Sequence, residues 1–331
     1  MSVRRVVLLI VLAFTAQTCF AQSATPLRVW AYKGLRPQLL QWEDGFTAEH
    51  PGARFINTFH GHAALMSGLY NGVADLVLMG RDIWPVETMA YRWVYQRQPF
   101  GVVVATADLD APGQAFTPVV IVNAKNPIGS ITLSQLDAVY GSEHRNAPAN
   151  IRTWGELGLT GSWASQPIHV YGFGGEDVLG VYFRHDVLRM DFKPNIDSHL
   201  LTGTTRRSPA QAIAAAVATD PYAIGYTAAP FAVHSRILAL AGTAEAITPT
   251  TSTLESHAYP MTRSVYLYFH RSNDAPLDAR IDSFLRYILS TQGQALVRTG
   301  SGFLPLDDQW IGSQLHKLNA PVPAAVTATE E

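Results

Sequence analysis

Apolar runs alternate with amphipathic stretches along the first hundred residues. The segments LRVWAY (27–32), ARFINTF (53–59) and ADLVLMG (74–80) have the length and composition of buried strands. Apolar residues recur at helical spacing from Pro37 to Phe46, and a second, shorter helix is expected from Ala63 to Tyr70. Strand, helix, strand, helix, strand with short connections predicts a parallel α/β sheet.

A second group of strands and helices follows, which indicates a two-lobed α/β protein. Glycine-ended strands alternate with helical segments up to AIGYT (223–227), and an alternating strand then runs from 259 to 271 before an expected long amphipathic helix at 278–299. We predict that each lobe is a mainly parallel sheet flanked by helices, and that the chain crosses between the lobes near 100–117 and 259–269. The predicted boundaries are 25–113 and 263–314 for lobe I, 114–262 for lobe II and 315–331 for a disordered tail.

The N-terminus has the pattern of a secretory signal peptide. Arg4 and Arg5 precede the apolar run VVLLIVLAF (6–14), and the small residue Ala21 marks a cleavage point, so we predict a signal peptide at 1–21 and a periplasmic protein. Cys19 is the only cysteine and lies inside this segment. Gln17, two positions before it, disfavours a lipid anchor, and the mature chain has no thiol for disulfides or catalysis.

Composition and missing motifs exclude several classes of function. The net charge is −2 at pH 7, and no basic run exceeds a pair, which argues against nucleic acid as a partner. The sequence contains no nucleophile elbow, no two-histidine helix motif and no phosphate-binding P-loop. We therefore expect no enzyme and no cofactor.

Five segments, in order, resemble a known family. They are LYNGVADLVLMGRDI (69–83), VVIVNAKNPIGSITLSQLDAVYG (119–141), DPYAIGYT (220–227), YPMTRSVYLYF (259–269) and LSTQGQALVRTGSGFLPL (289–306). Together they are similar to the phosphate-type substrate-binding proteins of ABC transporters, which have the type II periplasmic binding protein fold. The resemblance extends from about 27 to 306. It implies a monomer that closes by hinge motion around a small oxyanion and delivers it to an inner-membrane ABC permease.

The resemblance also locates the ligand site, but this chain departs from the family there. In the family, helix-start N–H groups, Ser/Thr hydroxyls and a lobe II arginine beside a Ser-Gly-Thr loop hold the oxyanion. Here the loops carry no Ser or Thr, and Glu176 and Asp177 stand where the arginine and hydroxyls are expected. Their carboxylates would repel phosphate. Only the backbone donors around Gly61 to Ala63 and Gly174 to Asp177 carry over from the family by position. Lys33 and Arg81 are added because they follow strands that should end between the lobes. The full set of expected ligand-binding residues is Tyr32, Lys33, Gly34, Gly61, His62, Ala63, Gly80, Arg81, Gly174, Gly175, Glu176 and Asp177.

Several of these residues have alternative interpretations. His60 and His62 would share a face and form half of a metal site, which Glu176 and Asp177 could complete; alternatively, a protonated His62 would attract an anion, or both histidines are ordinary packing residues. Arg81 either contacts an anion or pairs with Asp82 or Asp75.

Aromatic residues near these loops leave the nature of the ligand open. Tyr32, Phe173 and Trp84 would suit an organic ligand if they line the space between the lobes, although core packing is the competing interpretation for Trp84. The main functional prediction is an exported solute-binding protein for a phosphate-like oxyanion. The alternative is a periplasmic binding or sensing module, unlinked to transport, whose phosphate site has decayed or been retuned for an organic anion or a metal.

Overall fold

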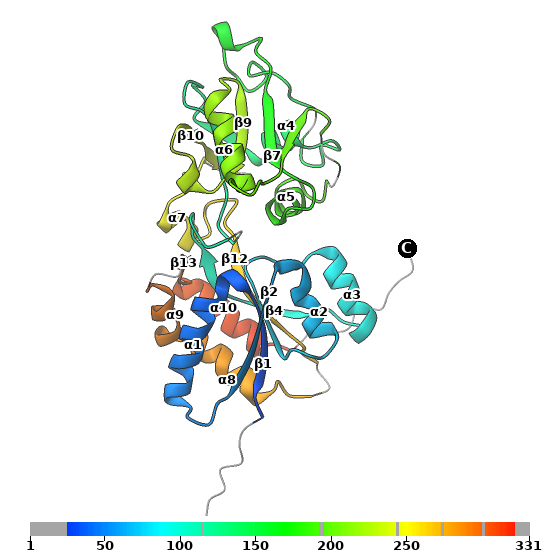
Figure 1. Cartoon of the computed structure of the whole chain (residues 1–331), viewed down its shortest axis with the longest axis vertical. Coiled ribbons are helices and arrows are strands. Elements are labelled where there is room, and N and C mark those ends of the chain that lie inside the picture. The colour runs from blue at the N-terminus through cyan, green and yellow to red at the C-terminus, as the bar shows by residue number, and fades with distance from the viewer. Residues whose placement is uncertain are drawn as a thin grey trace, which may run out of the picture.

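The computed structural model describes residues 25–321, except 114, 148, 192, 194, 243–244, 273–274 and 300–301. The expected signal peptide with Cys19, and residues 322–331 of the expected tail, lie outside the described residues. Figure 1 shows two α/β lobes stacked along the long axis of the molecule. In the part of the chain that is described, no helix is both long and apolar enough to cross a membrane.

Lobe I is built on a six-stranded sheet with the order β13-β4-β12-β3-β1-β2. Strand β1 pairs in parallel with β2 and β3, which confirms the predicted parallel arrangement of the first three strands. The pairs β12–β3, β12–β4 and β13–β4 are antiparallel, so the whole sheet is mixed and not mainly parallel as predicted. The strands are β1 (Leu27–Tyr32), β2 (Phe55–His60), β3 (Leu76–Met79), β4 (Phe100–Ala107), β12 (Ser264–Phe269) and β13 (Phe303–Leu304). The helices are α1 (Arg36–Glu49), α2 (Leu65–Tyr70), α3 (Pro85–Tyr95), α8 (Ala279–Ile288), α9 (Thr291–Val297) and α10 (Asp308–Asn319), with the 3-10 turns η1 (Lys33–Leu35) and η2 (His62–Ala64).

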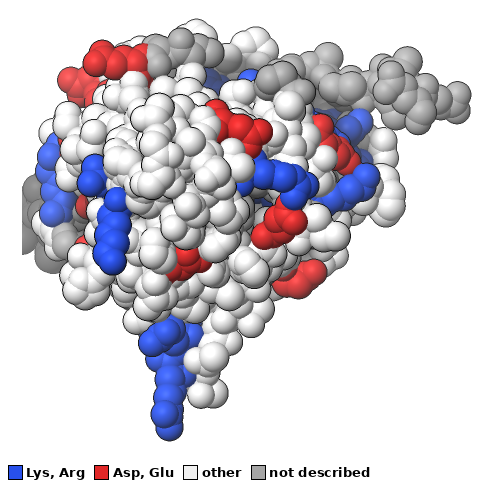
Figure 2. Space-filling model, turned by 90° about the horizontal axis from the view of Figure 1, so that it is seen from above, with Lys and Arg blue, Asp and Glu red and all other residues white. Residues whose placement is uncertain are grey.

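Lobe II is built on a five-stranded sheet with the order β10-β5-β9-β7-β8. Its strands are β5 (Val119–Asn123), β7 (His169–Phe173), β8 (Ser198–Leu201), β9 (Ala223–Thr227) and β10 (Ser235–Ile237), and β6 (Ser130–Thr132) pairs separately with β11 (Ala239–Ala241). Its helices are α4 (Leu133–Tyr140), α5 (Val178–Tyr182), the π-helix η4 (Phe183–Val187) and α6 (Pro209–Thr219), with 3-10 turns η3 (Gly161–Trp163) and η5 (Ala229–Phe231). Helix α7 (Thr251–Glu255) contacts β4 and β13 of lobe I. Seen from above in Figure 2, acidic and basic side chains are interspersed among uncharged ones.

Two neighbouring segments connect the lobes. The Ala107 carbonyl accepts a hydrogen bond from the Thr117 hydroxyl at 2.8 Å, and the Ala107 N–H donates to the Arg263 carbonyl at 2.8 Å. The Arg263 N–H in turn donates to the Thr117 hydroxyl at 3.2 Å. Because both crossings are bonded to each other, relative motion of the lobes has to bend them together, as in a hinge.

Two predicted elements near the C-terminus were wrong. The expected helix at 278–299 is divided into α8 and α9, because the Ser290 hydroxyl accepts a hydrogen bond from the Gly293 N–H and starts a new helix. The expected tail at 315 is still helical, since α10 continues to Asn319 and Leu318 is buried. The Pro/Ala/Thr/Glu composition that suggested disorder begins only after Asn319.

A buried carboxyl group on α1 makes stability dependent on pH. Glu43 is 6% exposed, its Oε2 accepts from Asn57 Nδ2 at 2.6 Å, and burial raises its pKa from 4.5 to about 7. In the unfolded chain the Glu43 carboxyl loses its proton near pH 4.5, whereas in the folded chain it keeps the proton up to about pH 7. The free energy of unfolding therefore falls as pH rises through this interval.

We expect Glu43→Gln to remove this pH dependence. Glutamine keeps the acceptor for Asn57 and has no proton to lose, so between pH 5 and 8 the wild type should lose about 1–3 kcal/mol relative to the variant. Urea unfolding at both pH values measures the difference. Glu49→Gln, at an exposed position of the same helix, is the control. Parallel pH profiles of wild type and Glu43→Gln would contradict the prediction.

Candidate functional site

The loops after β1 and β2 meet through a stacked pair of rings. Tyr32 and His62 stack with their centroids 3.6 Å apart and an interplanar angle of 18°. The Tyr32 ring also covers Gly34 and Gly113, where an added Cβ would collide with it. Gly113 has a φ of +68°, a second reason for glycine at that position. Tyr32 therefore joins two lobe I loops to the segment that leaves for lobe II.

His62 is buried and neutral. It is 3% exposed, and its Nε2 has no hydrogen-bond partner among the described residues. Burial, together with the positive charges of Arg81, Arg263 and Lys33, holds the pKa of the His62 imidazole well below its usual range. The lowered pKa argues against the hypothesis of a protonated His62, because removal from water among three cations disfavours the charged form. The Nε2 atom of the neutral His62 ring lies 3.5 Å from the point that a Cβ on Gly80 would occupy.

Arg81 is held by a different carboxylate from those expected. Its two terminal nitrogens donate to Glu87 Oε1 and Oε2 at 2.7 and 2.8 Å, and its guanidinium lies 3.8 Å from the centre of a Trp84 ring. The expected ion pair with Asp82 or Asp75 is wrong. Arg81 donates to the backbone carbonyl of Asp82 and not to its carboxylate, and Asp75 pairs with Arg28. Arg81 is 2% exposed, and its Nε is buried without a partner among the described residues.

Arg263 is a site residue that the sequence did not identify. It is 3% exposed, and its Nη1 and Nη2 donate to the Phe116 and Gly80 carbonyls, both at 2.9 Å. Its guanidinium lies 5.0 Å from the centre of the Tyr182 ring on lobe II. Burial lowers the pKa of Arg263 to about 10, so it remains a cation at neutral pH. Its position in the predicted crossing segment is the only signal that could have indicated it.

The lobe II loop at 174–177 contacts an arginine of the helical segment that follows it. Asp177 caps α5, since its Oδ1 accepts from the Leu179 N–H at 2.8 Å. Arg184, in η4, donates from Nη2 to the Gly175 carbonyl at 2.5 Å, and its buried Nε has no partner among the described residues. Because Arg184 follows Asp177 by seven residues, or two helical turns, it returns to the same side. That spacing was the signal that sequence reasoning missed.

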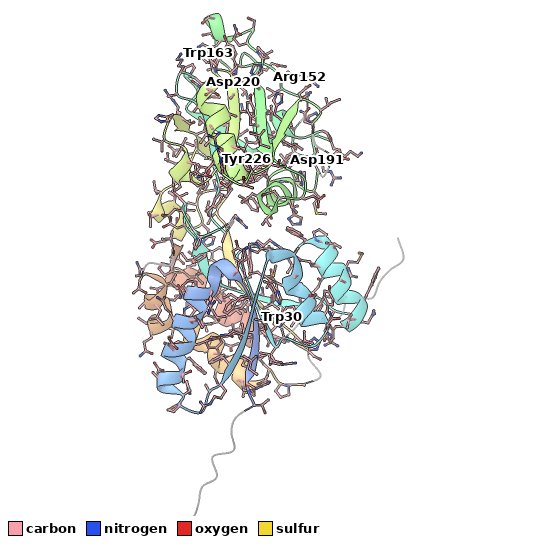
Figure 3. The ribbon with its side chains drawn as sticks, in the orientation of Figure 1. Trp30, Arg152, Trp163, Asp191, Asp220 and Tyr226 are labelled. Carbon is pink, nitrogen blue, oxygen red and sulfur yellow. The ribbon has the colours of Figure 1, made fainter. Side chains whose placement is uncertain are left out.

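The aromatic interior of lobe II supports this loop. Phe173, the last residue of β7, is 1% exposed and packs on Tyr226, which stacks on Phe183 at 4.0 Å between ring centroids. Tyr226 lies at the end of lobe II that faces lobe I (Figure 3). Glu176 is exposed, so its carboxylate lies on the surface of the loop.

The predicted residues thus fall into two groups. Tyr32, Gly34, His62, Gly80 and Arg81 come together in lobe I, while Gly174 to Asp177 form the lobe II loop. Lys33 is exposed, but its positive charge contributes to the lowered pKa of His62. Gly61 precedes η2 with open space at its Cβ position, and Ala63 lies exposed in η2.

The histidine pair does not form a metal centre with other ligands. The His60 ring packs on Trp30 at 4.4 Å between centroids, while His62 packs on Tyr32. Within the described ranges, no group of three or more His, Cys, Asp or Glu side chains is placed to hold a metal ion.

One cavity in the described part of the chain lies away from these residues. It has a volume of about 520 Å³ and lies at the β7–β8 side of lobe II, beside Arg152, His169 and Asn195. Figure 3 shows Arg152 near the far end of lobe II. Arg152 is paired with Asp197, and Asn195 Nδ2 donates to the Val139 carbonyl at 3.1 Å. These polar groups already have ion-pair or hydrogen-bond partners. The cavity therefore lacks unpartnered donors such as those described above for the residues between the lobes.

Two α/β lobes joined by paired crossings, with buried cationic side chains at the junction, define a two-lobed binding protein. The sequence pattern of the PBP superfamily domain matches residues 30–292, and this chain belongs to that family. The chain is 27% identical over 270 residues to the phosphate-binding protein PstS of Pseudomonas aeruginosa, covering 81% of this chain and 79% of that protein. The resemblance to phosphate-type substrate-binding proteins is thereby confirmed.

Solved structures agree on the fold. PstS from Borrelia burgdorferi aligns with a TM-score of 0.60 and 16% identity, over 86% of this chain and 99% of that one. An ABC-type phosphate transport receptor from Vibrio cholerae aligns with a TM-score of 0.56 and 16% identity, over 84% and 99% of the chains. The predicted two-lobed periplasmic binding protein fold is confirmed.

Proposed function

We propose that this chain is an exported, periplasmic solute-binding protein that captures a small oxyanion of the phosphate type between its lobes. It acts as a monomer, catalyses no reaction and delivers its ligand to an inner-membrane ABC permease. The observation that carries the proposal is a set of buried nitrogens that have no hydrogen-bond partner among the residues the structure describes: His62 Nε2 and Arg81 Nε on lobe I and Arg184 Nε on lobe II.

Buried donors without acceptors are costly, at about 1–3 kcal/mol each, and a ligand with acceptor oxygens between the lobes would remove that cost. An oxyanion supplies several such oxygens and carries the negative charge that the cations Arg184 and Arg263 attract. The relatives named above, described as phosphate-binding and phosphate transport proteins, point to the same ligand. Neither these names nor the donors favour the alternative of a module unlinked to transport.

Calorimetric titration of residues 22–331 with phosphate, sulfate and zinc tests the proposal. We expect micromolar binding of phosphate, and a loss of at least tenfold in affinity for Arg184→Met, since charged hydrogen bonds contribute about 1.5–3 kcal/mol each. Arg145→Met, at an exposed lobe II position paired with Glu143, is the control. Absence of heat with every oxyanion would overturn the proposal, and zinc binding alone would assign the site to a metal.

A further inference from the structure

A second, mostly apolar cavity adjoins the interlobe residues. It has a volume of about 320 Å³, and its walls include Gly113, Phe116, Phe173, Leu179, Pro209 and Phe231. Phe173 and Leu179 flank the lobe II loop at 174–177. Gly113 and Phe116 belong to the segment that crosses from lobe I. The cavity therefore lies between the crossing segment and that loop.

Three contacts connect this cavity to the cationic residues. The Tyr32 hydroxyl lies against Gly113, and the ring of the same Tyr32 stacks on the His62 imidazole. The carbonyl of Phe116 accepts from Arg263 Nη1 at 2.9 Å. The carbonyl of Gly175, in the loop after Phe173, accepts from Arg184 Nη2. The cavity is therefore linked to Arg263 through Phe116, which lines it, and to Arg184 through the loop that follows Phe173.

The cavity is larger and more apolar than an inorganic oxyanion needs. At about 30 Å³ for each water, 320 Å³ corresponds to roughly ten waters, whereas phosphate has five heavy atoms. Its polar lining consists of two residues: the Ser208 hydroxyl caps α6 by accepting from the Gln211 N–H at 3.3 Å, and the Gln211 side-chain oxygen accepts from the Ser208 N–H at 2.9 Å. Three phenylalanine rings at the other walls suit an organic substituent.

The donor set is correspondingly small. The loops at 33–34, 61–63, 80–82 and 174–177 contain no Ser or Thr, so the hydroxyls that would surround a fourth oxygen are missing. A phosphonate or a phosphate monoester presents three terminal oxygens and replaces or covers the fourth with carbon. Fewer donors beside an apolar cavity match that ligand better than they match free phosphate.

Resting on the proposed function, we propose that the site accepts monosubstituted phosphates or phosphonates, with the three terminal oxygens at His62, Arg184 and Arg263 and the organic substituent in the cavity of Phe116, Phe173 and Phe231. The Tyr32–His62 stack forms the wall between the two halves. Neutral His62 serves either as donor to an ionised oxygen or as acceptor from a protonated one, depending on its tautomer.

Calorimetry with inorganic phosphate, methylphosphonate and phenylphosphonate tests this inference. We expect phenylphosphonate to bind at least tenfold more tightly than methylphosphonate, because only the phenyl ring buries apolar area in the cavity. Phe231→Ala removes one wall and should reduce that ratio to about threefold or less. Val233→Ala is the control, since Val233 is an exposed apolar residue two positions away and outside this cavity.

Each outcome separates the inference from the proposed function. If phosphate binds and phenylphosphonate does not, or if the two phosphonates bind equally, the inference is overturned while the proposed function stands. If none of the three binds, the proposed function fails as well. The ratio in the wild-type protein decides the inference even if Phe231→Ala does not fold.

Discussion

Arg81→Met is expected to lower the free energy of unfolding by about 3–5 kcal/mol, because it leaves a buried carboxylate without its partner. Glu87 is 8% exposed and accepts both terminal nitrogens of Arg81. Its Oε2 also accepts from the Trp84 N–H at 2.7 Å at the start of α3. Methionine fills much of the arginine volume but cannot offset the charge, so the pair is lost and the cost of burying Glu87 remains.

Removing the orphaned charge should restore part of this loss. In Arg81→Met/Glu87→Gln, glutamine is neutral and keeps an acceptor for Trp84, so we expect the double variant to be about 2 kcal/mol more stable than the single one. Urea unfolding of both variants measures the difference, with the half-buried Arg92→Met on α3 as control. Equal stability of single and double variants would show that Glu87 is not the source of the penalty.

Strands such as β1 and β9 were predictable because each is a largely apolar run between turn residues. LRVWAY coincides with β1 and AIGYT with β9. The break between α8 and α9 was not predictable from periodicity, since apolar residues continue on the same face through the Ser290 cap. In the same way, the last turn of α10 depends on Leu318 packing into the core, which hydropathy alone does not reveal.

The candidate site was predictable only in its backbone. Loops that follow parallel strands meet at the carboxyl edge of the sheet, and that rule placed Tyr32, His62 and Gly80 together. The charges followed no such rule. Arg263 is 201 residues from His62 in sequence (263 − 62), and no local pattern could show that it helps to keep the imidazole neutral. Arg81 was identified, yet its pairing with Glu87 depends on the orientation of α3.

Arg263 differs from Arg81 in what surrounds its charge, and this gives the second prediction. Its Nη groups donate to the carbonyls of Gly80 and Phe116, which are dipoles without net charge. The Tyr182 ring contributes a cation–π contact, and the negative charge of Asp186 acts on Arg263 against the larger effect of burial. In a buried, weakly polarisable environment such a cation attracts an anion over several ångströms, more strongly than an exposed one would.

We therefore expect Arg263→Met to weaken phosphate binding by at least a hundredfold, equivalent to about 2.7 kcal/mol. Arg263→Lys should lose about tenfold, because an ammonium keeps the charge but cannot reach both carbonyls in the planar geometry of a guanidinium. Calorimetry measures affinity, and thermal unfolding of each variant shows whether the fold is retained.

Arg271→Met is the matched control, because Arg271 follows the same strand β12 at its far end and packs on Phe100 in lobe I. It should bind phosphate like the wild type. The distinction between the two arginines follows from position: Arg263 contacts Gly80 on lobe I and Tyr182 on lobe II, so its charge acts where the lobes meet. A folded Arg263→Met protein with unchanged phosphate affinity would mean that Arg263 only fastens the hinge, and the attraction for the ligand would then have to come from Arg184 and the loop amides of lobe II.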